Sequence, residues 1–501
     1  MEKFDLIVIG SGPAGFAAAM RALDFGNNVC IVEKKSIGGA GVLNGALTSK
    51  SMWELSMDYA VAANVSRGYR ASGLTVDFAK VRQTVLKAAK EKQYQLLSQI
   101  ETFARNADSK ASLSLRYGHA RFLDTNTVEV TGDGGEKLQI WAKDFVIATG
   151  SRPREYEGFE VDNERIINSD GVLDLKAFPE RMVIIGSGII GCEFATIFSN
   201  FGQTEVHMID RYNRVIPFED DDLSDFVAAN LAANGVQIHH TASLRTIRKQ
   251  KTHLEVVLDY TDGHSRVIEA DVALVAIGRI PNTDDLGLEK LGLTTTERGF
   301  LKINDVCRVG NNPHKSHIFA AGDITGHGQL YNVAETQGRY AAKAIYNQIK
   351  YPLTYSNMST LMFFKPEVAA VGANEKELQQ GKHPYRVAYY ANEMVNRSIA
   401  MRNTNGFVKI MISDTDDQRI LGMRAAGPQA SAFIVSVAHL IDKGNTLKDI
   451  MKIIHPHPSV TEGIQECIRV FSQKSVMKPK AFPDLISLRR WSPEHGMELL
   501  S

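Results

Sequence analysis

Two stretches of the chain, about 175 residues apart, show the same order of apolar and polar positions. Each has a continuous apolar run, a glycine-rich turn, a segment of small and apolar residues, and a second apolar run that ends in a carboxylate. The first covers residues 6–33 and the second residues 182–210. Continuous apolar runs are typical of strands buried on both faces. The repeated order therefore predicts two βαβ units, each in a parallel sheet covered by helices.

The remaining pattern predicts elements of both kinds. Residues 77–107 predict a long amphipathic helix with Lys and Glu on its polar face. Strands are predicted at residues 113–130, 138–147, 255–258, 267–275, 367–371, 385–390 and 406–412, and further helices near residues 430–443 and 447–454. The last segment, residues 474–501, carries three prolines and mixed charge. We predict that it is a tail or surface arm.

The turn of each unit has the spacing Gly-x-Gly-x-x-Gly. The glycines are Gly10, Gly12 and Gly15 in the first unit and Gly186, Gly188 and Gly191 in the second. Such glycines let a backbone turn and a helix N-terminus approach a pyrophosphate, and a carboxylate about 20 residues on accepts from a ribose 2′-hydroxyl. Glu33 and Asp210 hold that place. The chain is therefore predicted to bind two dinucleotides.

The second carboxylate also bears on which dinucleotide binds there. A carboxylate at the position of Asp210 repels a 2′-phosphate, which favours NAD(H) over NADP(H). Arg211 and Arg214 follow closely and could partly offset that repulsion. NAD(H) is the expected partner, with NADP(H) as the alternative.

Composition limits the classes of function. A length of 501 residues is enough for about three domains. The 57 basic and 57 acidic residues give no net charge, so nothing in the overall charge points to nucleic acid. The apolar runs are shorter than the ~18 residues of a membrane span. No basic region precedes the first strand, so we expect a cytoplasmic protein without a membrane span.

The four cysteines are scattered along the chain. They are Cys30, Cys192, Cys307 and Cys467. None forms a C-x-x-C pair, so neither a metal cluster nor a secreted disulfide framework is expected. Buried structural thiols are the expected state. Cys192 and Cys467 lie near site motifs and are the two to check for a redox role.

A loop after the first unit carries a family resemblance. Residues 38–50 are Gly-Gly-Ala-Gly-Val-Leu-Asn-Gly-Ala-Leu-Thr-Ser-Lys. They resemble the redox-disulfide segment of the pyridine nucleotide–disulfide oxidoreductases, Gly-Gly-Thr-Cys-Leu-Asn-Val-Gly-Cys-Ile-Pro-Ser-Lys. Gly41 and Ala46 stand where that family has its two cysteines. A member without them can still accept electrons from a nicotinamide but cannot pass them to a thiol in the usual way.

The resemblance covers roughly residues 4–472 and implies FAD at the first unit. By the same resemblance, Asp323 contacts the ribityl–phosphate part of FAD and Gly118 lies against the adenine. Other cofactor-binding positions implied by matched motifs are Thr149, Gly150, Ser151 and Gly278. Lys50 and Glu193 match a lysine and a glutamate that pair beside the flavin N5. A cation there stabilises the anionic reduced ring.

Residues 455–462, His-Pro-His-Pro-Ser-Val-Thr-Glu, resemble the family's C-terminal signature. This resemblance makes His457 the catalytic acid/base, reaching the site of the other subunit across a homodimer. Glu462 would orient it and raise its basicity, whereas His455 falls on the non-catalytic first histidine of the motif. Since the thiol partner is gone, either the pair is a structural feature of the interface or it protonates a different acceptor.

The predicted fold class is α/β, with two Rossmann-like dinucleotide-binding domains and a C-terminal α+β dimerisation domain. The expected domains are an FAD-binding domain at residues 1–155 and 283–352, an NAD(P)-binding domain at 156–282, a dimerisation domain at 353–473 and the tail at 474–501. The expected activity, like that of dihydrolipoamide dehydrogenase but without its disulfide, is FAD-dependent oxidation of NAD(P)H. Its acceptor would be a quinone or other small oxidant.

Two alternatives stay open at this point. The soluble pyridine nucleotide transhydrogenases of this family also lack a complete cysteine pair, but they do not keep the histidine. The chain could also be a non-catalytic FAD-binding partner or redox-sensing subunit, although the intact Lys50, Glu193, Asp210 and His457 speak against that alternative.

Overall fold

The computed structural model describes residues 1–68, 70–104, 111–310 and 316–500. It divides into two compact units, each discontinuous in sequence. Unit 1 comprises Met1–Glu180, Thr252–Leu254 and Asp271–Leu353, and unit 2 comprises Arg181–Lys251, Glu255–Ala270 and Thr354–Ser501. Within the described ranges, no helix is long and apolar enough to cross a membrane.

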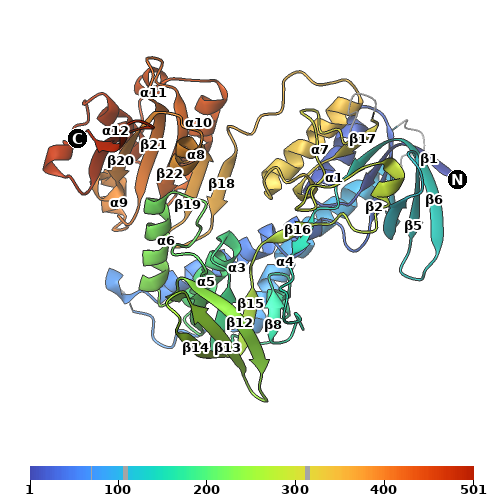
Figure 1. Cartoon of the computed structure of the whole chain (residues 1–501), viewed down its shortest axis with the longest axis horizontal. Helices are drawn as coiled ribbons and strands as arrows, with labels where there is room; N and C mark the ends of the chain where they lie inside the picture. Colours follow the sequence, from blue (N-terminus) through green and yellow to red (C-terminus); the bar gives the residue numbers. More distant parts are fainter. Residues whose placement is uncertain (69, 105–110, 311–315, 501) are drawn as a thin grey trace. The chain divides into compact units, whose positions relative to one another are not determined.

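Unit 1 is built on a seven-stranded sheet in the order β3-β2-β1-β6-β5-β4, with β17 beside β6 (Figure 1). The strands are β1 (Glu2–Ile9), β2 (Asn28–Glu33), β3 (Ser112–Tyr117), β4 (His119–Phe122), β5 (Thr127–Thr131), β6 (Lys137–Ile147) and β17 (Ile318–Ala320). Strands β3, β2, β1, β6 and β17 are parallel, and β5 pairs antiparallel with both β6 and β4. The first predicted βαβ unit is therefore confirmed.

The core explains why residues 6–9 of β1 form a continuous apolar run. Successive side chains of a strand point to opposite faces. Leu6 and Val8 belong to one buried cluster, and Ile7 and Ile9 belong to the cluster on the other face. Because both faces are covered, none of residues 6–9 faces water.

Three helices contribute two or more buried residues each to the first of these clusters: α1 (Pro13–Asp24), α4 (Phe78–Ala104) and α7 (Tyr331–Ile345). Helix α4 confirms the prediction of a long amphipathic helix, whose last predicted residues, 105–107, lie outside the described residues. Two further helices, α2 (Gly39–Leu43) and α3 (Ala46–Ala62), carry the segment that resembles the redox-disulfide loop. Unit 1 also contains the strand pairs β7 (Ser151–Pro153) with β16 (Arg279–Pro281) and β8 (Ile166–Asn168) with β15 (Val272–Val275).

Unit 2 contains the second βαβ unit. Strands β9 (Arg181–Ile185), β10 (Glu205–Ile209) and β11 (Gln237–His239) are parallel neighbours. Helix α5 (Ile189–Phe201) connects β9 to β10, and α6 (Asp221–Ala233) precedes β11. A three-stranded sheet of β12 (Ala242–Lys249), β13 (Leu254–Tyr260) and β14 (Ser265–Ala270) follows.

The C-terminal part of unit 2 is a second seven-stranded sheet, in the order β18-β19-β22-β21-β20-β23-β24 and antiparallel throughout (Figure 1). The strands are β18 (Ser359–Met362), β19 (Val368–Gly372), β20 (Tyr385–Ala391), β21 (Phe407–Ser413), β22 (Ile420–Ala426), β23 (Ile486–Ser492) and β24 (Gly496–Leu499). The helices of this part are α8 (Glu375–Gln380), α9 (Asn396–Ala400), α10 (Ser431–Asp442), α11 (Leu447–Met451) and α12 (Glu462–Phe471). Residues of α10, α11 and α12 share a buried cluster with the strands.

The prediction that residues 474–501 form a tail or surface arm is wrong. Strand β23 pairs with β20 along its length, and β24 pairs with β23. Ile486 and Leu488 are buried in the core of this sheet, whereas the residues between and after them are more exposed. This alternation is typical of a strand with one buried face. The prediction of a tail rested instead on the prolines that precede the strand.

A buried ion cluster lies between α6 and the C-terminal sheet within unit 2. The Lys409 ammonium of β21 is within 2.7 Å of an Asp220 oxygen, 2.6 Å of Asp222 and 2.9 Å of Glu375. Burial opposes the charge of Lys409, but the three carboxylates outweigh it and raise its pKa. Among the residues that the structure describes, these carboxylates are the one group close enough to share a metal ion, and Lys409 lies among them.

Candidate functional site

The first glycine-rich turn has one glycine that protein packing does not explain. Gly10 has φ +101°, and a Cβ there would lie 2.4 Å from the Ala148 carbonyl oxygen. A Cβ at Gly15 would lie 1.9 Å from the Gly10 oxygen. At Gly12, however, a Cβ would meet no protein atom within 4 Å. The open side of Gly12, at the N-terminus of α1, fits the pyrophosphate of a dinucleotide.

The second turn repeats this arrangement. Gly186 has φ +111°, and a Cβ at Gly191 would lie 2.0 Å from the Gly186 oxygen. Around Gly188 a Cβ would again find open space. In each turn, therefore, a side chain at the first or third glycine is excluded by the protein backbone, whereas the middle glycine faces open space that a ligand can fill.

The predicted carboxylate of the first unit lies beside its turn. The Ser11 backbone N–H and hydroxyl donate to one Glu33 oxygen at 2.9 and 2.6 Å, and the Lys35 N–H donates to the other at 2.8 Å. Gly118 is also brought here, since its N–H donates to the Glu33 carbonyl at 2.9 Å. The structure thus gathers the predicted ribose and adenine residues at one end of the sheet, and Ser11 is a member that sequence reasoning missed.

Asp210 directly follows β10 and is 1 % exposed. It accepts from the Tyr212 N–H at 2.9 Å and lies 3.3 Å from Nδ1 of His240. Burial raises the pKa of the Asp210 carboxyl. Arg214, expected as one of two cations offsetting this carboxylate, instead binds Asp225 at 2.8 Å and Asp221 at 3.2 Å.

The segment at residues 148–151 and the segment that contains Asp323 meet in unit 1. Ser151 donates to Asp323 at 2.5 Å, and Nε of Arg279 donates to the Ser151 hydroxyl at 2.8 Å. The Thr149 hydroxyl donates to the Asn282 carbonyl at 2.7 Å. The segment that contains Gly150 is therefore fixed against the one that contains Gly278. A Cβ at either glycine would meet no protein atom within 4 Å.

The segment at residues 38–50, which resembles the redox-disulfide segment, contains no cysteine. All four cysteines of the chain are free and buried elsewhere, at Cys30, Cys192, Cys307 and Cys467. Burial raises the pKa of each of these thiols. Since the thiolate is the reactive form, these thiols are disfavoured as nucleophiles, and the expectation of buried structural thiols is confirmed.

Lys50 lies in α3 of unit 1, and Glu193 lies in α5 of unit 2. Glu193 is 5 % exposed and accepts from the Phe363 N–H at 3.2 Å. The pairing of Lys50 with Glu193 beside a flavin stays a prediction.

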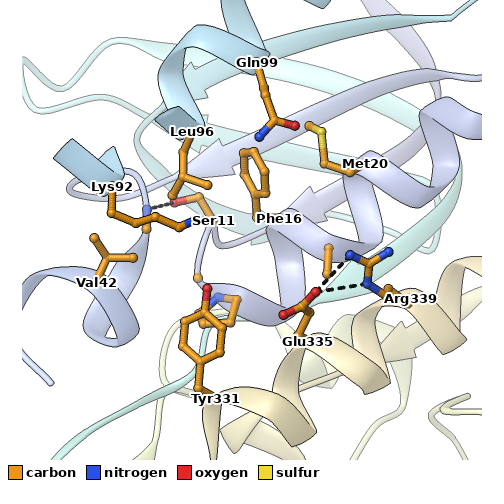
Figure 2. A pocket seen from close by; sticks show the side chains of 14 residues that line it. Ser11, Phe16, Met20, Val42, Lys92, Leu96, Gln99, Tyr331, Glu335 and Arg339 are labelled. Atoms are coloured by element: carbon orange, nitrogen blue, oxygen red, sulfur yellow. Dashed lines mark hydrogen bonds and ion pairs between the residues drawn. The ribbon is translucent and has the colours of Figure 1, made fainter. Parts of the chain in front are cut away.

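A pocket of about 240 Å³ opens at the first turn (Figure 2). It is lined by Ser11, Gly12, Pro13 and residues of α1, α4 and α7. Figure 2 shows Lys92 reaching into it from α4 and Tyr331 entering it from α7. Sequence reasoning missed both residues, because only the tertiary fold brings α4 and α7 to the turn.

His457 and Glu462 form the predicted pair. Nδ1 of His457 lies 2.6 Å from Oε1 of Glu462, and the other Glu462 oxygen accepts from the Ser459 N–H at 3.0 Å. Glu462 is the first residue of α12, where the helix dipole favours a carboxylate. The His457 side chain is 65 % exposed. The contact with the carboxylate is made by Nδ1 and not by Nε2.

The chain combines two glycine-rich turns of the dinucleotide-binding kind, a carboxylate beside the first of them and a C-terminal α+β domain. This combination defines a class of flavin- and nicotinamide-dependent oxidoreductases. Residues 4–338 match the pyridine nucleotide-disulphide oxidoreductase family model, and residues 358–468 match the dimerisation domain of the same family. The chain belongs to this family, which uses FAD and NAD(H). The dimerisation domain supports a homodimer.

Curated relatives agree with this membership. The chain is 32 % identical over 468 residues to a dihydrolipoyl dehydrogenase of Bacillus subtilis, covering 93 % of this chain and 96 % of that protein. It is 32 % identical over 481 residues to dihydrolipoyl dehydrogenase 3 of Haloarcula marismortui, with 94 % and 97 % coverage. The fold is similar to that of LpdA from Mycobacterium tuberculosis, with a TM-score of 0.84 and 24 % identity over 94 % of this chain and 100 % of that one.

Proposed function

We propose that this chain oxidises NADH through FAD and passes the electrons directly to a non-disulfide acceptor, a quinone or another small oxidant. FAD, when bound, supplies the two-electron chemistry between the nicotinamide and the acceptor. The observation that carries the proposal is the segment at residues 38–50, which has no cysteine, together with the burial of all four cysteines elsewhere.

The geometry and the family resemblance together support the following roles for the chain's own residues. The turn at Gly12 and the carboxylate of Glu33 would hold the FAD pyrophosphate and ribose, and Asp323 would hold its ribityl–phosphate part. The turn at Gly188 and the carboxylate of Asp210 would hold the nicotinamide dinucleotide. His457, oriented by Glu462, would deliver a proton to the acceptor. The domain boundaries given above and the cytoplasmic location stay predictions.

A steady-state screen tests the proposal. The FAD-loaded protein is given NADH or NADPH with quinones, thio-NAD(P)⁺, lipoamide and glutathione disulfide in turn. We expect turnover with quinones or another small oxidant and none above background with the two disulfides. Turnover of thio-NAD(P)⁺ alone would favour the transhydrogenase. Turnover of lipoamide would contradict the proposal. Failure of NADH to bleach the flavin would favour a non-catalytic flavoprotein.

Asp210 is expected to set the preference for NADH. We expect the ratio of kcat/KM for NADH to that for NADPH to fall about tenfold in Asp210→Ala, because the variant loses a carboxylate that repels a 2′-phosphate and binds a ribose hydroxyl. Asp262→Asn, which removes an exposed carboxylate paired with His264, is the matched control and should leave the ratio unchanged. A wild-type preference for NADPH would show that Asp210 does not have this role.

Lys92 is expected to supply the positive charge for the FAD pyrophosphate, because it lines the same pocket as Gly12. Arg339, the other cation that lines this pocket, binds Glu335 at 2.9 Å. Lys92→Met should weaken FAD binding about tenfold, since one charge-assisted hydrogen bond is lost. Quenching of FAD fluorescence on titration into the apoprotein measures this change. Lys87→Met, on an exposed part of the same helix, should bind FAD normally. Equal affinities for the two variants would contradict the assignment.

A further inference from the structure

Gly41 has no backbone reason to be glycine. It lies inside α2 and has none of the positive φ values that favour glycine elsewhere in the chain. A glycine within a helix destabilises the folded protein by about 0.5–1 kcal/mol relative to an alanine at the same position. Something other than the backbone conformation therefore disfavours a side chain at this position.

Neighbouring side chains supply the reason. A Cβ at position 41 would lie 2.8 Å from Cγ of Pro13 and 2.9 and 3.1 Å from Cδ2 and Cε2 of Tyr331. Approaches under 3.0 Å force one of the groups to move. Cγ of Pro13 can shift when the five-membered ring changes pucker. The two Tyr331 atoms belong to a rigid ring, which moves only if the whole side chain rotates.

Tyr331 is the first residue of α7, so this helix sets the position of its backbone. Val333 and Ala334, two and three residues further along the helix, are buried, and Ala334 belongs to the apolar core of unit 1. The helix cannot withdraw without exposing them. The Tyr331 ring lines the pocket at the first turn together with Pro13 and Val42, so it shares the space that borders α2 (Figure 2).

We propose that Tyr331 is a specificity-determining residue that prevents this site from holding a redox disulfide. Its ring occupies volume that a thiol at position 41 would need. Replacing Gly41 and Ala46 by cysteine would therefore not be enough to recreate a disulfide. This inference rests on the proposed function, because it explains why the site would serve acceptors that take electrons directly and not acceptors reached through a thiol.

The test compares three variants of the FAD-loaded protein: G41C/A46C, G41C/A46C/Y331F and G41C/A46C/Y331A. Each is treated with diamide, which takes up two electrons and two protons as a pair of thiols becomes a disulfide. Thiols are then counted after denaturation, and the bridge is located by peptide mass mapping. We expect six thiols, the four native and the two introduced, when Tyr or Phe occupies position 331. With Ala, we expect two fewer and a bridge between residues 41 and 46.

A bridge formed equally in all three variants would overturn the inference, and so would its absence in all three. A second measurement covers variants that fold poorly. Gly41→Ala should lower the Tm in the wild type and leave it unchanged or raise it in a Tyr331→Ala background. Equal shifts in the two backgrounds would also overturn the inference. Neither readout depends on the electron acceptor, so failure of the proposed function appears separately, in the acceptor screen.

Discussion

Anaerobic titration of the FAD-loaded protein with NADH should bleach the visible absorbance of the flavin without a long-wavelength charge-transfer band. Such a band requires a thiolate beside the flavin ring. Residues 38–50 contain no cysteine, and burial raises the pKa of every thiol in the chain, to about 12 for Cys30 and Cys307. The thiolate that the band needs is therefore absent at neutral pH.

For the same reason, lipoamide and glutathione disulfide should be reduced no faster than in the absence of protein. A dihydrolipoyl dehydrogenase assayed in parallel, which gives both the band and lipoamide turnover, is the positive control. Appearance of the band in this chain would contradict the prediction and implicate Cys192 or Cys467, the two thiols near site motifs. Cys192→Ala and Cys467→Ala would then identify which of them is responsible.

Replacement of His457 by alanine should slow reoxidation by a proton-requiring acceptor by about 10²–10⁴-fold, the usual contribution of a general acid. The rate at which NADH bleaches the flavin should hardly change, since hydride transfer from the nicotinamide needs no proton from this residue. Stopped-flow absorbance measures the two half-reactions separately. A transhydrogenase would show little effect in either, because its acceptor also takes a hydride.

Two variants serve as comparisons for His457. Glu462→Gln should give a smaller loss in the same half-reaction, because the carboxylate 2.6 Å from Nδ1 only orients the imidazole and supports its charge. His455→Ala, in the same loop, should leave reoxidation unchanged. If His457→Ala reoxidises at the wild-type rate with every active acceptor, His457 has an interface role and the catalytic assignment is wrong.

The parts of the site that could be predicted from sequence are those fixed by short-range spacing. The positions of the glycines around Gly12 and Gly188 can be predicted because they lie within a βαβ unit of about 30 residues. The same is true of the carboxylate at the end of the second strand of each unit. The pairing of His457 with Glu462 likewise depends on residues five positions apart. In each case the local backbone brings the groups together, so the order of residues carries the information.

The parts that could not be predicted depend on contacts between distant segments. Tyr331 meets position 41, and Lys92 meets the first turn, only after α7 and α4 have packed. In the sequence, Gly41 is only one glycine of a glycine-rich segment, and nothing in that segment points to Tyr331. The pairing of β23 with β20 was missed because the alternation within a strand does not identify the strand that pairs with it.

The ion cluster around Lys409 has a consequence for the order in which this protein forms during synthesis. Domains generally fold as units as the chain emerges, and the last residue of unit 1 is Leu353. Asp220 and Asp222 are made early, but their counter-charge arrives only with Lys409, and β23 arrives later still. We therefore expect unit 1 to fold while the chain is still on the ribosome. Unit 2 should fold only after its final strands have been synthesised, and until then its carboxylates stay in contact with water.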